Sequence, residues 1–128
     1  MKSEEIWVPD AWHSGAPYSP GLRRGPFLFL SGAVPVDRGD GATVGTEIRA
    51  QTAQVITNLE AVLAAAGASL ADVVKTTVFI TEQSLAAGMN EVYAERFQAP
   101  RPARSTFVVG PLARPEFLVE IEAIAVPA

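Results

Sequence analysis

Three β-rich runs carry apolar side chains at both alternating positions of the strand, and this feature restricts the fold more than any other. The runs are "FLFLSGAVPV" (residues 27–36), "VVKTTVFI" (73–80) and "FLVEIEAIAV" (117–126). Successive side chains of a strand point to opposite faces of a sheet, so these runs need apolar cover on both faces. A chain of 128 residues has little material with which to build two covering layers.

Two segments show the periodicity of amphipathic helices. In residues 46–66 the apolar positions fall on one helical face, with Thr46 placed to cap the start and Gly67 to end the helix. Residues 84–97 show a second apolar face of the same kind. These two helices are enough to cover one face of a sheet.

Capping residues, glycines and prolines indicate where the strands and loops lie. Ser69 and Asp72 have the spacing of a capping box just before the strand at 73–80. Further strands are expected at 27–36, 105–109 and 117–126, and glycine and proline mark most of residues 9–45 as loops.

The predicted fold is α+β, with one single-layer mixed sheet of five or six strands and two helices on one face. Residues 1–128 form a single domain of ordinary size and composition. Because no residues remain to cover the second face, another copy of the chain is the simplest cover, and we expect a homo-oligomer.

Charge and composition exclude several classes of function. The net charge is −4 and the ten Lys and Arg residues are scattered, which disfavours a nucleic-acid partner. With no cysteine and one histidine, His13, the chain has too few nitrogen and sulfur ligands for a zinc site, and we expect no structural metal. The N-terminus lacks a signal-peptide pattern and the longest apolar runs are too short to span a bilayer, so we expect a cytoplasmic protein without a membrane partner.

Several polar residues do not fit a purely structural sheet. Glu120 and Glu122 share one face of the last strand, and Arg104 and Lys75 are cations inside other strands that could pair with them. One interpretation is a set of structural ion pairs or a solvated edge. The other is a functional site in which Arg104 clamps a carboxylate and a glutamate binds or activates water.

Two loop residues, His13 and Tyr18, also have both a functional and a purely structural interpretation. His13 in "WHSGAPYS" is either a general base or a solvent-exposed loop residue. Tyr18 presents its ring to a pocket or covers the core.

The succession "GAPYS", "FLFLSGAVPVD", "QTAQVITNLEAVLAAAG", "DVVKTTVFIT", "NEVYAERF", "PARSTF" and "VEIEAIAV" resembles the Rid (YjgF/RidA) family of reactive intermediate deaminases. The resemblance covers almost the whole chain, and "PARS" with the terminal "EIEAIA" is its most specific part. It implies a fold like that of the chorismate mutase of Bacillus and a homotrimer with clefts between subunits.

The implied activity is hydrolysis of enamine and imine intermediates, typically 2-aminoacrylate through its imine 2-iminopropionate, to 2-keto acids and ammonia. Such 2-iminobutanoate/2-iminopropanoate deaminases limit metabolite damage and need no cofactor or metal. By the resemblance, Arg104 grips the substrate carboxylate and Glu120 positions the attacking water. The residues implied to contact substrate are Tyr18, Ser31, Gly32, Asn90 and Thr106.

The chain also departs from the family pattern. Thr106 stands where many members have cysteine, and the connection after residue 108 is one residue longer than usual, which leaves Glu122 as an alternative to Glu120. Trp12 and His13 are larger than the usual residues before Tyr18. Two other functions therefore stay open, namely a non-catalytic trimer that binds keto acids or amino acids with a regulatory role, and a pathway-specific deaminase of a bulkier substrate.

Overall fold

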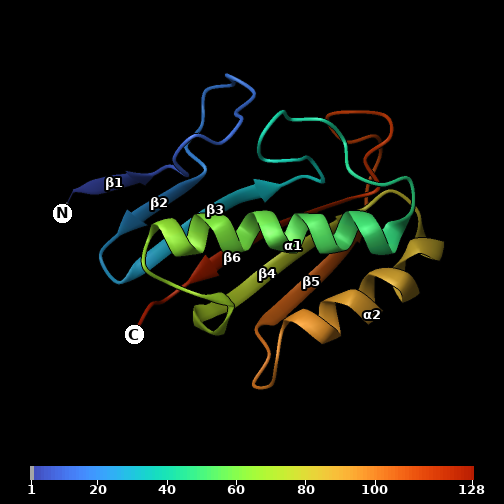
Figure 1. Cartoon of the computed structure of the whole chain (residues 1–128). Helices are drawn as coiled ribbons and strands as arrows, with labels where there is room; N and C mark the ends of the chain where they lie inside the picture. Colours follow the sequence, from blue (N-terminus) through green and yellow to red (C-terminus); the bar gives the residue numbers. More distant parts are fainter. Residues whose placement is uncertain (1) are drawn as a thin grey trace.

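The computed structural model describes residues 2–128 and shows two helices lying across one face of a six-stranded sheet (Figure 1). The strands are β1 (Ser3–Ile6), β2 (Gly21–Arg24), β3 (Phe27–Ala33), β4 (Val73–Ile80), β5 (Ala103–Val108) and β6 (Val119–Ala125). The helices are α1 (Ile48–Ala65) and α2 (Ala86–Arg96), with short 3₁₀ turns η1 (Leu70–Asp72) and η2 (Gln83–Leu85). The predicted α+β class, with both helices on one face, is confirmed.

The strand order is β1-β2-β3-β6-β4-β5. All neighbours are antiparallel except β4 and β5, which are parallel because α2 carries the chain back between them. The last strand of the chain, β6, therefore lies in the middle of the sheet, between β3 and β4.

The core lies between the helices and the sheet. One apolar stripe of α1, which includes Val55, Ile56 and Leu59, is fully buried against alternate residues of the central strands such as Val78 and Ile121. Burial of this stripe, more than helix propensity, holds α1 in place.

The helix ends were predicted almost correctly. The cap of α1 is Glu47, and the expectation of Thr46 was wrong by one residue, because the Glu47 carboxylate accepts hydrogen bonds from the backbone N–H groups of Arg49 and Ala50. Gly67 does follow the helix with a φ of +74°, as a helix-ending glycine should. The capping box of Ser69 and Asp72 is present.

Two short strands were not predicted, β1 before the region expected to be loops and β2 inside it. β1 and β2 pair with each other, and β2 pairs with β3, so the sheet extends by two short strands beyond the predicted hydrophobic runs. Both are four residues long and carry charged side chains, and β2 is positioned by pairing with β3 and β1 by pairing with β2.

The face of the sheet without helices is rich in exposed aromatic side chains. Phe29 is 42% exposed and Phe107 is 52% exposed, and Phe107 stacks on Phe79 of the neighbouring strand. The prediction of apolar side chains on both faces is confirmed, and no element of residues 2–128 covers this second face.

Candidate functional site

A cleft of about 650 Å³ is lined by residues of three loops and of the ends of β3 and β6. We call it the Glu120 cleft. Its walls come from the loop before β2, the end of β3, the loop before β6 and β6 itself. They include Tyr18, Ser31, Gly32, Arg114, Phe117, Glu120 and Glu122.

The Glu120 carboxylate at the cleft occupies the space where any other residue at position 32 would have its side chain. A Cβ atom added to Gly32 would come within 2.8 Å of the Glu120 Cδ atom, so only glycine allows this carboxylate to lie against β3. Glu122 lies two residues further along the same face but is exposed. The geometry thus favours Glu120 over Glu122 as the carboxylate that meets a bound ligand.

Burial raises the pKa of Glu120 above its usual value, and the charge of Glu122 raises it further. Half-burial removes water from the carboxylate and so penalises its charged form. A carboxylate with a raised pKa is a better proton acceptor near neutral pH than a free one.

Ser31 fixes the loop that carries Tyr18. Its hydroxyl donates to the carbonyl of Ser19 at 2.7 Å, and its backbone N–H donates to the carbonyl of Pro20 at 3.0 Å. The Tyr18 ring, 45% exposed, is thereby held at the cleft wall. Ser31 acts here as a support for the wall.

Two polar residues of α1, Gln51 and Asn58, position the cleft walls. The Gln51 side chain is fully buried; its Oε1 accepts from the backbone N–H of Leu118, and its Nε2 donates to the carbonyls of Glu116 and Gly45. Asn58 donates to two carbonyls of the segment after β3. Both are polar interruptions of the apolar helix face, and that pattern was the available signal for them.

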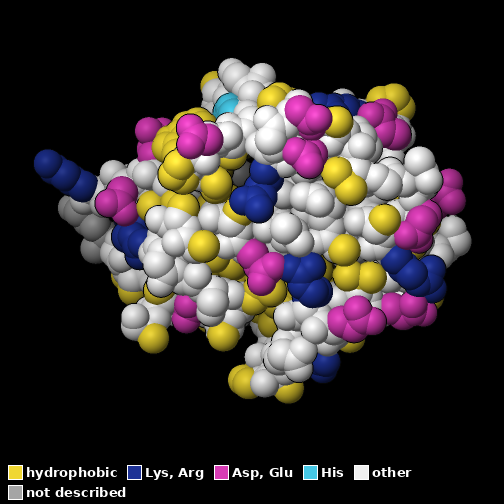
Figure 2. Space-filling view, in the orientation of Figure 1, with side chains coloured by type: hydrophobic (Ala, Val, Ile, Leu, Met, Phe, Trp, Pro, Cys, Tyr) yellow, Lys and Arg dark blue, Asp and Glu magenta, His cyan; other side chains and the backbone are white. Residues whose placement is uncertain are grey.

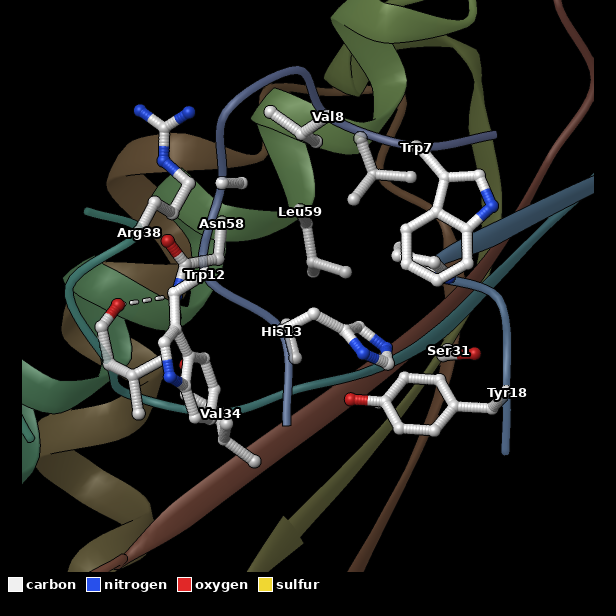
Figure 3. Close-up of a pocket in the computed structure, with 16 residues that line it drawn as sticks. Trp7, Val8, Trp12, His13, Tyr18, Ser31, Val34, Arg38, Asn58 and Leu59 are labelled. Atoms are coloured by element: carbon white, nitrogen blue, oxygen red, sulfur yellow. Dashed lines mark hydrogen bonds between the residues drawn. The ribbon is translucent and has the colours of Figure 1, made fainter. Parts of the chain in front are cut away.

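A second, smaller pocket of about 110 Å³ lies behind Ser31 and Gly32 (Figure 3). Aromatic rings form one part of its wall, where His13 lies between Trp7 and Tyr18 with ring centroids 4.8 Å from each. His13 Nδ1 accepts a hydrogen bond from the Gly15 N–H, while its buried Nε2 has no partner within residues 2–128. His13 is therefore part of an aromatic wall and lies outside the Glu120 cleft.

Arg104 lies on the other face of the sheet from Glu120. It pairs with Thr76 across β4 and β5, and Thr76 points to the helices, where its hydroxyl shares a 2.7 Å hydrogen bond with the Tyr93 hydroxyl. The Arg104 guanidinium lies over the Tyr93 ring, with its carbon 4.8 Å from the ring centroid. Glu120 instead pairs with Phe79, whose side chain points to the face without helices.

The predicted pairing of the glutamates with Arg104 or Lys75 is therefore wrong for a single chain. Lys75 shares the face of Glu122, but its ammonium donates to the Thr76 carbonyl and the Ser105 hydroxyl. Neither cation forms an ion pair with Glu120 or Glu122 among the described residues. The error comes from strand order, because β5 pairs with β4 and not with β6.

The other two predicted contacts, Thr106 and Asn90, also lie outside the cleft. Thr106 is exposed on β5, on the Arg104 side of the edge strand, and Asn90 is exposed on α2. One chain thus brings together Tyr18, Ser31, Gly32 and Glu120, and leaves Arg104, Thr106 and Asn90 elsewhere on its surface.

Within residues 2–128, no group of three or more His, Cys, Asp and Glu residues is arranged to hold a metal ion. No helix there has the length and apolar character to cross a membrane.

The fold and cleft define a small α+β domain with a half-buried carboxylate at the wall of a cleft. A family model described as endoribonuclease L-PSP matches residues 9–127. The chain belongs to this family, and the predicted membership of the Rid (YjgF/RidA) family is confirmed.

Three relatives illustrate the similarity. A RutC family protein of Pyrococcus horikoshii is 44% identical over 122 residues, which cover 95% of this chain and 96% of the relative. Reactive Intermediate Deaminase A of Arabidopsis thaliana, a chloroplastic protein, is 36% identical over 98% of this chain and 66% of its own length. The structure of E. coli TdcF with bound serine superposes with a TM-score of 0.90 at 36% identity, covering 98% of this chain and 99% of that chain.

Proposed function

We propose that the protein is a cofactor-independent deaminase that hydrolyses carboxylate-bearing imines, of the 2-iminopropionate type, to 2-keto acids and ammonia. The observation that carries the proposal is the Glu120 carboxylate, half-buried beside Gly32 with a raised pKa. Membership of a family that includes a reactive intermediate deaminase supports it.

We propose further that the site is completed between copies of the chain. Arg104 and Glu120 lie on opposite faces of one sheet, so Arg104 would have to enter the cleft of a neighbouring copy to hold the substrate. A contact between two different surfaces of identical chains is heterologous, and it forms a closed ring when the rotation between copies closes. The family resemblance implies three copies, and a homotrimer would bury the exposed Phe29 and Phe107.

In this arrangement each residue has a simple task. Arg104 of one copy fixes the substrate carboxylate with a bidentate pair of hydrogen bonds. Glu120 accepts a proton from the water that attacks the imine carbon and then passes a proton to the departing nitrogen. Tyr18 and the Ser31–Gly32 backbone form the wall against which the imine is oriented.

The description of the family model names an endoribonuclease, but the charge of this chain argues against RNA as its substrate. The net charge is −4, and on the face shown in Figure 2 Lys and Arg side chains are interspersed with Asp and Glu. RNA is therefore a control substrate in the test of the proposal.

The test generates 2-iminopropionate from alanine with an amino-acid oxidase and follows pyruvate and ammonia release with and without the protein. We expect acceleration by the native chain. Arg104→Ala should lose roughly ten- to hundredfold in kcat/KM, and Glu120→Gln should lose about 10²- to 10⁴-fold in kcat. Activity that survives the Arg104 change would refute the clamp.

The same preparations test the alternatives. Saturable binding of 2-ketobutyrate without any acceleration would favour a non-catalytic binding protein. Analytical ultracentrifugation at micromolar concentration should show a trimer, and a monomer would refute the shared site.

A further inference from the structure

Arg114 places a second guanidinium in the Glu120 cleft, and the imine chemistry proposed above does not use it. It belongs to the loop between β5 and β6 and lines the same cleft as Glu120 and Tyr18. Its guanidinium carbon lies 5.5 Å from the centroid of the Trp12 ring and 5.3 Å from that of Phe117. Two aromatic faces thus hold the cation in a fixed place.

The guanidinium keeps most of its donors free. Of its five N–H groups, one donates to the Thr43 hydroxyl at 3.1 Å, and no carboxylate of residues 2–128 lies within 4.0 Å. The nearby Glu116 is itself held by the Thr43 hydroxyl at 2.8 Å. A half-buried guanidinium with unused donors, held at a cleft wall, is suited to bind an anion.

A monocarboxylate imine would leave this cation unpaired. In the proposed site its one carboxylate is bound by Arg104 of the neighbouring copy, and its reacting carbon lies at Glu120. A three-carbon imine also fills only part of a cleft of about 650 Å³. The remaining space leads to Arg114.

We propose that Arg114 binds a second carboxylate and thereby selects imines of dicarboxylic amino acids, such as 2-iminosuccinate and 2-iminoglutarate. This inference deepens the proposed function and rests on it. The reaction is unchanged: the water oxygen bonds to the imine carbon, the C–N bond breaks, and the nitrogen leaves as ammonia with the two protons of that water. Arg114 is a specificity-determining residue that orients the far end of the substrate.

The first experiment compares three imines, made in situ from alanine, aspartate and glutamate by the matching oxidases. The native protein should show a higher kcat/KM for at least one dicarboxylic imine than for 2-iminopropionate. Arg114→Met keeps the aliphatic stem between the two rings but removes the charge. It should lower kcat/KM for the dicarboxylic imines roughly ten- to hundredfold and leave 2-iminopropionate within about twofold.

Two further variants separate charge from packing. Arg114→Lys keeps a cation and should restore part of the preference for dicarboxylic imines. If every Arg114 variant instead lowers kcat/KM equally for all three imines, Arg114 has a structural role and the inference is overturned. Arg24→Met removes a charge from the end of β2 that pairs with Phe27, at the opposite end of β3 from Gly32, and should change none of the three rates.

A binding measurement decides the inference even if no imine is hydrolysed. Calorimetric titration should give tighter binding of oxaloacetate or 2-oxoglutarate than of pyruvate, and Arg114→Met should abolish that difference. If hydrolysis fails but this preference holds, the proposed function is wrong and the anion site stands. Hydrolysis of 2-iminopropionate with no preference for any dicarboxylate would leave the proposed function standing and refute the role of Arg114.

Discussion

Among single residues, Gly32 has the strictest steric requirement in the cleft, because an added Cβ would contact the Glu120 carboxylate. Gly32→Ala should push that carboxylate away from β3 and lower kcat by roughly ten- to hundredfold, since small misplacements of reacting groups are costly. Gly110→Ala is the matched control, as open space surrounds its Cβ position. Equal activity of the two variants in the 2-iminopropionate assay would contradict the role given to Gly32.

The Glu120 side chain also makes the stability of the fold depend on pH. Because its pKa is higher in the folded protein than the usual 4.5, the folded state holds this proton more tightly, and stability falls as pH rises from about 4.5 through the raised pKa. Glu120→Gln should therefore raise Tm relative to the native chain, and the difference should grow between pH 4 and pH 7.

The control for this prediction is Glu47, whose contribution to stability changes with pH in the opposite direction. The backbone N–H groups of Arg49 and Ala50 lower the pKa of Glu47, so its stabilisation is present at neutral pH and is lost as pH falls through the lowered value. Glu47→Gln should lower Tm at pH 7, with a difference that shrinks toward pH 3. Thermal melts of both variants across this pH range check the two signs together.

At the scale of elements, α1 holds the loops of the cleft through the buried Gln51. Gln51→Met would leave the Leu118 N–H and the Glu116 carbonyl without their partners, at a cost of about 2–4 kcal/mol in the free energy of unfolding. Thr52→Val is the contrasting change, because the buried Thr52 hydroxyl has no partner within the described residues. Urea denaturation should show an unchanged or higher free energy of unfolding for Thr52→Val. Similar decreases for Thr52→Val and Gln51→Met would contradict the role of the Gln51 hydrogen bonds.

For the whole molecule, the separation of Arg104 from Glu120 predicts complementation between inactive variants. If each site takes Arg104 from one copy and Glu120 from the next, mixed trimers of Arg104→Ala and Glu120→Gln chains contain some native sites. Random mixing should restore about a quarter of the native activity, after the two variants are unfolded together and refolded. No recovery in trimers shown by mass spectrometry to be mixed would place both residues in a site of one chain.

The sequence predicted the fold well where periodicity reports burial directly. Residues 46–66 and 84–97 became helices because their apolar stripes face the sheet, and the runs at 27–36 and 73–80 became central strands. β1 and β2 were missed because they are short and rich in charged residues, and because β2 depends on pairing with β3 and β1 on pairing with β2.

The candidate site was predicted in part for a related reason. Glu120, Gly32 and Tyr18 meet in one cleft, as the family resemblance implied. The face on which Arg104 lies depends on strand order and register, which local sequence does not report, and the presence of Arg114 at the cleft was not predicted because its loop has no periodic pattern.

The opposite placement of Arg104 and Glu120 has a consequence for the amount of protein present. If the site is shared between copies as proposed, a single chain is inactive, so activity per chain should rise with concentration and disappear on dilution below the dissociation constant of the assembly. In the proposed arrangement, catalysis is a property of the population of chains, and a cell could switch it on simply by making more of them.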